Sequence, residues 1–291
     1  MNSNQSNNNE TEEPLDAPQA TMEILDLDHP GAKDPDYRVR REHIATLARE
    51  YRANPSIVPT LEYTDDEHAT WREVSTILNE LHPDRACGMY LRAKNILEIP
   101  TDHIPQMREL SERIRRFNGM RLGPVEGLID SRSFLVSLAN KRMFCTQYVR
   151  HHSRPTFSPE PDIIHEVQGH APTFADADFV EFSRLLGEAA RAASDEELKQ
   201  IERLYWFTLE YGMIEEKGKP KAFGAGLLAG IEDMNNAFKT NADIRPFVLD
   251  EVINTEYNYS FMQDKYFIIP SFEFLKYETA RLLARFNNEK K

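Results

Sequence analysis

The stretch His165-Glu166-Val167-Gln168-Gly169-His170, followed by Glu210 in the aromatic-rich run 205–212, is the most informative part of this chain. Two imidazoles and one carboxylate can occupy one face of an octahedral metal ion and leave the opposite face open, as in non-haem Fe(II) oxygenases. Glu210 lies among large apolar side chains, where an unpaired carboxylate would be unfavourable. We therefore expect His165, His170 and Glu210 to share one metal ion.

The spacing of the two histidines leaves alternatives open. In an ideal α-helix, residues at i and i+5 lie about 140° apart, so both can reach one metal only if the helix is wide or ends between them. Gly169 and Pro172 allow such an ending. The zinc protease motif H-E-x-x-H has a different spacing, but a zinc hydrolase with Glu166 as its base stays a rival. The second rival interpretation is a metal-free helical binding protein with two surface histidines.

Composition narrows the class of protein. The chain has 291 residues, 40% of them apolar, with a formal net charge of −13 and two cysteines. This favours one globular domain that acts on a small molecule, because nucleic acids and anionic membranes are bound mainly by Lys and Arg. Few cysteines, no long apolar run and no secretory signal pattern predict a cytoplasmic protein that does not span a membrane.

Periodicity predicts a mostly α fold with a few short strands. Residues 1–26 are polar and acidic, so we expect a disordered tail followed by one domain at 27–291. Amphipathic patterns predict helices at about 36–54, 64–82, 86–98, 105–117, 131–141, 178–192, 195–216 and 272–286. Strand patterns are short, near 144–148 and 266–269.

The motifs around the two histidines resemble the pterin-dependent aromatic amino acid hydroxylases. The resemblance covers about residues 27 to 287 and rests on several long motifs in the family's order. These are residues 28–31 and 33–35 at the start of the catalytic domain, then 145–151, 158–162, 165–170 and 221–228. It implies that 27–291 is an aromatic amino acid hydroxylase-like catalytic domain, and with no segment resembling the family's tetramerising helix we expect a monomer.

The resemblance also assigns roles near the metal. It implies that His165, His170 and Glu210 bind Fe(II) and that Glu166 faces the pterin and acts in catalysis, together with Trp206 and Tyr205. In the family, the segment corresponding to residues 127–135 binds tetrahydropterin, with an aromatic ring stacked on the cofactor. The expected pterin contacts in this chain are Gly127, Leu128, Ile129, Phe134 and Leu135, in addition to Glu166.

The expected contacts to an amino acid substrate come from the same motifs. Arg150 is the candidate for the substrate carboxylate, because a planar guanidinium can bind it through two hydrogen bonds. Asp162 has a counterpart in the family that orients a ligand imidazole. The remaining expected substrate contacts are Ser158, Pro161, Phe144 and Trp206.

The expected reaction is hydroxylation of L-phenylalanine to L-tyrosine with O2 and a reduced pterin. Tyrosine, tryptophan or another ring position is the alternative, because small pocket changes shift such preferences by only about 1 to 3 kcal/mol. This chain departs from the family pattern where the substrate would be selected. Ala229-Gly230 stands in place of the usual Ser-Ser pair, Ser158 in place of Thr, Phe144 in place of a polar residue, and Val167-Gln168 in place of an apolar pair.

Overall fold

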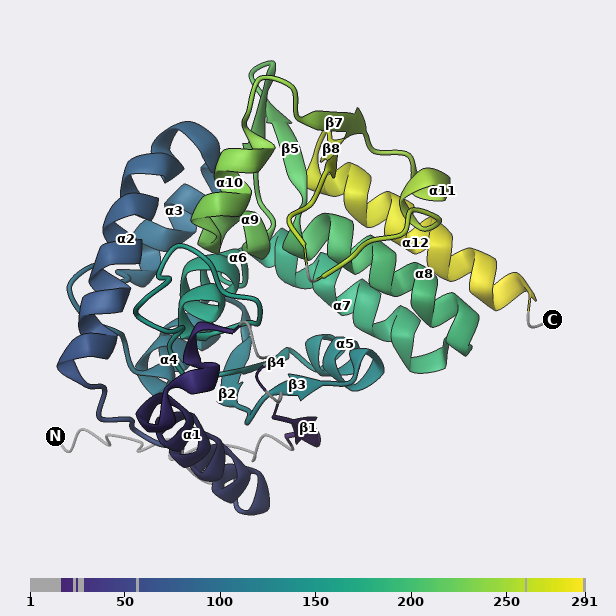
Figure 1. The fold of residues 1–291 in the computed structure, drawn as a ribbon. Helices are drawn as coiled ribbons and strands as arrows, with labels where there is room; N and C mark the ends of the chain where they lie inside the picture. Colours follow the sequence, from purple (N-terminus) through teal and green to yellow (C-terminus); the bar gives the residue numbers. More distant parts are fainter. Residues whose placement is uncertain (1–16, 23–24, 26–28, 56–57, 260, 290–291) are drawn as a thin grey trace, which may run out of the picture.

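Long helices enclose the segments that carry the two histidines and Glu210 in the computed structural model, which describes residues 17–22, 25, 29–55, 58–259 and 261–289. Helices α1 to α4 lie on one side and α7, α8 and α12 on the other, with α6 and α9 between them (Figure 1). The α-helices are α1 Pro35–Ala53, α2 Asp65–Arg85, α3 Gly88–Leu97, α4 Met107–Asn118, α5 Ser131–Ala139, α6 Ala171–Thr173, α7 Ala177–Ala192, α8 Asp195–Tyr205, α9 Ala225–Ala229, α10 Ile231–Ala237, α11 Leu249–Val252 and α12 Phe272–Glu289. A 3-10 helix, η1, spans Pro30–Lys33, and two π-helices span η2 His165–His170 and η3 Trp206–Glu210. The expected fold class is confirmed.

Local side chains determine where the long helices begin. Thr64 caps α2 through a reciprocal capping box with Glu67, and Ser194 caps α8 in the same way with Glu197. We expected His82-Pro83 to end α2, but this helix continues to Arg85. A proline in the last turn removes only one hydrogen bond of the helix, so the helix tolerates it there.

The expected helix at 195–216 is wrong beyond Glu210. The chain passes through η3 and then forms strand β5 (Met213–Glu216), which pairs antiparallel with β6 (Lys219–Ala222). Lys217 and Gly218 connect the two strands and both have positive φ, at 54° and 75°. Positive φ at both central residues is typical of the type I′ turn, which matches the twist of a hairpin.

The strands form three small sheets. The largest has the order β6-β5-β8-β7, with β5, β8 and β7 parallel to one another, and lies beside α12 (Figure 1). A parallel pair, β2 with β4, and an antiparallel pair, β1 with β3, complete the set. The bounds of the other strands are β1 Ala20–Thr21, β2 Arg121–Pro124, β3 Leu128–Ile129, β4 Arg142–Cys145, β7 Asp243–Pro246 and β8 Lys265–Ile269.

The predicted tail at 1–26 is wrong where the structure describes it as strand. Ala20 pairs with Ile129 and Thr21 with Leu128, so the folded domain begins before residue 27. A strand of two residues is too short to show a periodic pattern. Its pairing also depends on a partner that lies far along the chain. The rest of the predicted tail at 1–16, 23–24 and 26 lies outside the described residues.

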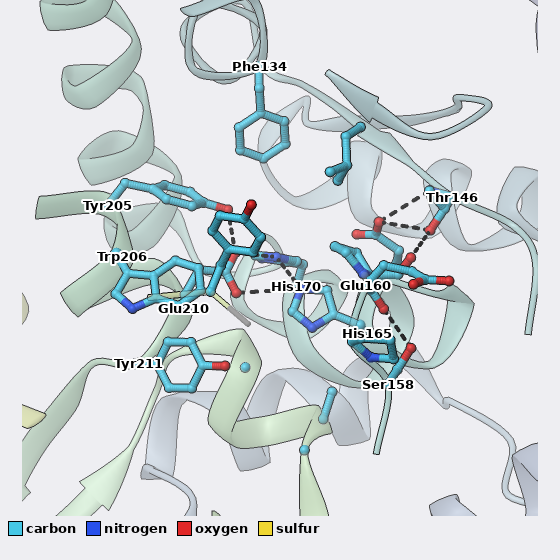
Figure 2. Close-up of a pocket in the computed structure, with 18 of the residues that line it drawn as sticks. Phe134, Thr146, Ser158, Glu160, His165, His170, Tyr205, Trp206, Glu210 and Tyr211 are labelled. Atoms are coloured by element: carbon cyan, nitrogen blue, oxygen red, sulfur yellow. Dashed lines mark hydrogen bonds and ion pairs between the residues drawn. The ribbon is translucent and has the colours of Figure 1, made fainter. Parts of the chain in front are cut away.

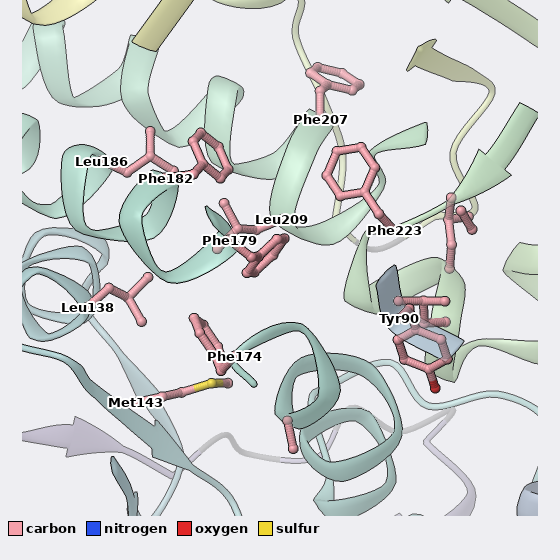
Figure 3. Packing of buried hydrophobic residues seen from close by; sticks show 14 of the residues in the cluster. Tyr90, Leu138, Met143, Phe174, Phe179, Phe182, Leu186, Phe207, Leu209 and Phe223 are labelled. Carbon is pink, nitrogen blue, oxygen red and sulfur yellow. The ribbon is translucent and has the colours of Figure 1, made fainter. Parts of the chain in front are cut away.

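The core is built around aromatic side chains of α7 and its neighbours. Phe179 is fully buried and makes edge contacts with Phe174, Phe182 and Phe223 (Figure 3). Edge-to-face contacts of this kind favour one fixed arrangement of the rings. Within the described part of the chain, we find no helix with the length and apolarity that crossing a bilayer requires.

Candidate metal centre and cavity

Each of the two π-helices supplies residues of the predicted metal site. In η2, the main-chain N–H of Ala171 donates to the carbonyl of Glu166, and in η3 that of Tyr211 donates to Trp206 at 2.9 Å. Both bonds span five residues, which widens the turn. The sequence left open whether the helix at His165 is wide or ends before His170. The structure shows the wide helix.

The three predicted metal ligands converge. The Nε2 atoms of His165 and His170 are 3.1 Å apart, and those atoms lie 3.5 Å and 3.1 Å from the Glu210 carboxylate oxygens. Ligand atoms in adjacent positions around an octahedral ion, with bonds of roughly 2.1 Å, are separated by roughly 3 Å. These residues therefore fit one metal ion bound on a single face. Among the described residues, they are the cluster whose ligand atoms all lie within 4.8 Å of one another.

The charge states of Glu210 and His165 suit a divalent cation. For His170, burial lowers the pKa, but Glu210 and Glu166 outweigh it and raise the pKa. Burial raises the pKa of Glu210, but His170, His165 and the phenol of Tyr205 outweigh it and lower the pKa to about 2. Burial lowers the pKa of His165 to about 4, so its imidazole stays neutral near pH 7. Tyr205 donates its hydroxyl to Glu210 Oε1. An ionised carboxylate beside a neutral imidazole is a good ligand pair for a metal ion.

The metal ligands open onto a cavity of about 340 Å³, a volume typical of small-molecule sites. Every residue predicted for the site lines this cavity, although these residues come from segments between 127 and 210 (Figure 2). The predicted metal ligands lie between the predicted pterin residue Phe134 and the predicted substrate residue Ser158. The structure therefore brings the whole predicted set together.

Glu166 lies in the cavity wall and is not part of the ligand cluster. Its Oε1 accepts hydrogen bonds from the main-chain N–H of Thr146 at 3.2 Å and from the Thr146 hydroxyl at 3.3 Å. Burial raises the pKa of Glu166 to about 7, although His170 and Thr146 oppose the change. A carboxyl group with a pKa near neutrality can exchange a proton with a bound molecule.

Arg150 is held by Asp162 at the edge of the cavity. Its Nε and Nη2 donate to the two oxygens of Asp162 at 3.0 and 2.8 Å, and Nη1 donates to the Pro155 carbonyl at 3.2 Å. These bonds use three of the five guanidinium N–H groups, and two remain for a ligand. Asp162 contacts His165 through the main-chain N–H of that residue, at 3.0 Å, and not through its imidazole as we expected.

The N-terminal strand β1 pairs with β3, which is part of the predicted pterin wall. Phe134 lies edge-on to Tyr205, with ring centroids 5.5 Å apart. Gly127 lies directly under the strand β1 segment, because a Cβ atom at this residue would lie 2.3 Å from the carbonyl oxygen of Thr21. Only glycine therefore permits this approach of the two segments. The other predicted contacts on this wall are Leu128, Ile129 and Leu135.

The predicted position of Trp206 is only partly correct. In an α-helix, Trp206 would lie on nearly the same face as Glu210, four residues later, but the wider turn of η3 gives that place to Tyr205. Trp206 still lines the cavity, stacks on Tyr257 at 4.5 Å and donates its indole N–H to Gln263 at 2.9 Å. These contacts make Trp206 part of a rigid aromatic wall.

The structure adds cavity residues that the sequence did not indicate. Tyr257 and Asp233 line the cavity from segments without a recognisable motif. Thr146 lay in a matched motif, and its two bonds to Glu166 could have been inferred only from contacts far apart in sequence. Tyr259 also lines the cavity and is 71% exposed.

Comparison with known proteins agrees with this geometry. The family described as biopterin-dependent aromatic amino acid hydroxylase matches residues 16–289. Tyrosine 3-monooxygenase of Homo sapiens is 43% identical over 252 residues, covering 85% of this chain and 48% of that protein. Phenylalanine-4-hydroxylase of Bos taurus is 39% identical over 264 residues, covering 89% and 58%. The chain thus spans about half the length of these curated relatives.

Solved structures are similar over most of the chain. Phenylalanine hydroxylase from Chromobacterium violaceum, with bound iron(III) and the oxidized cofactor 7,8-dihydrobiopterin, superposes with a TM-score of 0.72 at 29% identity. The match covers 78% of this chain and 84% of that one. The cold-active phenylalanine hydroxylase from Colwellia psychrerythraea has a TM-score of 0.72 at 28% identity, covering 78% and 90%.

Proposed function

Because this chain belongs to the biopterin-dependent aromatic amino acid hydroxylases, we propose that it uses Fe(II), a tetrahydropterin and O2 to hydroxylate the ring of a free aromatic amino acid. The observation that carries the proposal is the convergence of His165, His170 and Glu210 on one face of a possible metal position inside a cavity. The opposite face of that position is free for exchangeable ligands.

In this proposal, different residues of the chain bind the metal, position the cofactor and the substrate, and exchange a proton. Bound iron and reduced pterin would supply the activation of O2. The two π-helices hold the three ligands, Phe134 packs against the flat cofactor, and Glu166 holds or releases a proton at its Oε atoms beside it. Arg150 fixes the substrate carboxylate with its two free N–H groups. Trp206 and Tyr257 keep water away from the substrate ring.

Phenylalanine is the substrate that we propose, with tyrosine as the product. The cavity wall contains the buried side chain of Phe144 together with Trp206 and Ala229, which favours an apolar ring. Tyrosine is the second candidate, because a tyrosine 3-monooxygenase is among the most similar relatives at 43% identity. That the protein acts as a cytoplasmic monomer stays a prediction.

The test is turnover with each candidate substrate. The purified chain is loaded with Fe(II), supplied with tetrahydropterin and O2, and given phenylalanine, tyrosine or tryptophan in turn. We expect tyrosine to form from phenylalanine, identified by mass and retention time. Metal analysis after loading with equal iron and zinc distinguishes the rivals: iron-dependent product supports the hydroxylase, whereas zinc-dependent hydrolysis or the absence of bound metal would refute it.

A further inference from the structure

Asp233 is an acidic cavity residue to which the proposed chemistry gives no role. It is the third residue of α10 and lines the cavity together with Arg150 and Gly230. In the part of the chain that the structure describes, its carboxylate forms no ion pair within 4.0 Å. It accepts a hydrogen bond from the main-chain N–H of Asp233 itself. It therefore presents acceptor capacity toward the cavity.

The backbone at Gly230 makes room for this carboxylate. A Cβ atom at residue 230 would lie 2.7 Å from Asp233 Oδ2 and 2.6 Å from the carbonyl oxygen of Gly226. Any side chain at residue 230 would force Asp233 to move. The absence of a side chain at Gly230 thus leaves the space that the Asp233 carboxylate occupies.

Among the residues that the structure describes, Arg150 offsets the charge of Asp233 only in part. Burial and the neighbouring Glu232 raise the pKa of Asp233 to about 6, and Arg150 lowers it only in part. The guanidinium of Arg150 is already paired with Asp162 at 2.8 Å. Glu232, by contrast, accepts a bond from Thr156 at 2.9 Å and contacts Arg154 at 3.5 Å. A mobile cation in the cavity would be stabilised beside Asp233.

We propose that Asp233 binds the α-ammonium group of the amino acid substrate while Arg150 binds its carboxylate. This inference rests on the proposed function and deepens it. A free amino acid carries one positive and one negative group on the same carbon, and this end of the cavity offers one acceptor and one donor of matching charge. The pair selects intact amino acids over aromatic acids or amines of the same ring.

The test compares ligands that lack one charged group. Equilibrium binding of phenylalanine, 3-phenylpropanoate and 2-phenylethylamine is measured by calorimetry on the iron-loaded chain and on two variants. Asp233→Asn removes the proposed ammonium partner, and Glu232→Gln is the matched control for loss of one charge on the same helix turn. Both variants are first checked for wild-type thermal stability.

The wild-type chain should bind phenylalanine more tightly than 3-phenylpropanoate, by about ten- to a hundred-fold for one charged hydrogen bond. Asp233→Asn should remove most of that preference, raise the KM for phenylalanine and leave kcat and the pterin KM nearly unchanged. Glu232→Gln should keep the preference.

The outcomes separate the inference from the proposed function. Suppose that phenylalanine binds the wild type and that Asp233→Asn keeps the full preference for phenylalanine over 3-phenylpropanoate. The proposed ammonium site is then wrong, whereas the proposed hydroxylase function still stands. If Asp233 serves only as a first-turn helix acid, its variant should lose stability and weaken all three ligands equally, which also overturns the inference. If phenylalanine does not bind the wild type, both proposals fall.

Discussion

Glu210 shows how strongly neighbouring side chains control the protonation state of one residue. Burial by itself would favour the protonated carboxyl group, yet the two imidazoles and Tyr205 lower its pKa to about 2. Glu166 is buried in the same cavity, but its opposing contacts are weaker, and its pKa is raised to about 7. Two glutamates in one cavity are thus suited to different tasks, a charged metal ligand and a proton exchanger.

The first prediction separates these two roles. Glu210→Ala should reduce bound iron from about one ion per chain to near zero, because a facial site loses one of its three protein ligands. Glu166→Gln is the matched control and should retain its iron while losing turnover. Iron content is measured by atomic spectroscopy after loading and gel filtration. Equal iron content in the two variants would remove Glu210 from the site.

The second prediction concerns Arg150. Arg150→Lys keeps a positive charge but cannot form the two parallel bonds to Asp162 or bind a carboxylate in the same way. We expect the KM for phenylalanine to rise about ten-fold or more, with the pterin KM little changed. Steady-state kinetics with each reactant varied in turn measures both values. A rise confined to the pterin KM would contradict the assignment.

The alanine variant at the same residue would report mainly on folding. Asp162 is fully buried, and Arg150 is the partner that holds its pKa low against burial. Removing one side of a buried ion pair typically costs about 3–5 kcal/mol. Arg150→Lys is therefore the informative change, because it keeps a cation beside Asp162.

Among the elements, η2 depends on a partner from another helix. Pro172 lies four residues after Gln168 and has no N–H, so the usual α-helical partner of the Gln168 carbonyl is absent. Tyr90 of α3 donates its hydroxyl to this carbonyl at 2.6 Å. The amide of Gln168 in turn donates to Ser75 of α2 at 3.0 Å. The π-helix that carries both histidines is thus held in place by α2 and α3.

The third prediction tests this support. Tyr90→Phe leaves a buried carbonyl without the hydroxyl, which typically costs about 1–3 kcal/mol, and we expect weaker iron binding as well as a lower unfolding midpoint. Tyr63→Phe is the control, because Tyr63 also donates to a main-chain carbonyl at 3.1 Å, that of Gln147, which is not a residue of η2. It should lose stability without losing iron affinity.

Iron affinity and the unfolding midpoint are measured on both variants by chelator competition and thermal denaturation. Equal effects on iron affinity in Tyr90→Phe and Tyr63→Phe would show that Tyr90 has no special relation to η2. An unchanged iron affinity in both variants would lead to the same conclusion.

At the scale of the whole molecule, His82 joins the N-terminal helices to the segment beside the metal centre. It is buried in α2, and its Nε2 lies 2.8 Å from the carbonyl oxygen of Leu228 in α9. Burial and the nearby Lys94 lower its pKa from 6.5 to about 3. The folded protein therefore keeps His82 neutral at pH values where the unfolded chain would protonate it.

The fourth prediction follows from this difference. The stability that His82 contributes is fully present above pH 6.5 and is lost as the pH falls from 6.5 toward 3, at up to about 1.4 kcal/mol per pH unit. His82→Gln should therefore show a smaller fall in the free energy of unfolding between pH 7 and pH 5 than the wild type does. Denaturant titrations at both pH values measure it. Equal falls in the two proteins would contradict the prediction.

Much of the fold and of the site could be predicted because it depends on local patterns. The spacing of the metal ligands, the capping residues Thr64 and Ser194 and the amphipathic stripes act over a few residues, and the family motifs are continuous stretches. The same reasoning failed where a distant partner decides the conformation. Strand β1 needs β3, and the 213–216 segment became a strand because β6 and β8 pair with it.

The sequence by itself determined which side chains could bind a metal ion, since His165, His170 and Glu210 are identified by type, spacing and surrounding motif. Only the tertiary structure decided how they meet. The wide turns of η2 and η3 place residues five apart on one face, so that Tyr205 rather than Trp206 touches Glu210. Asp233 and Arg150 are 83 residues apart in the sequence, yet they line the same cavity. Such contacts between distant segments leave no periodic signal in the chain.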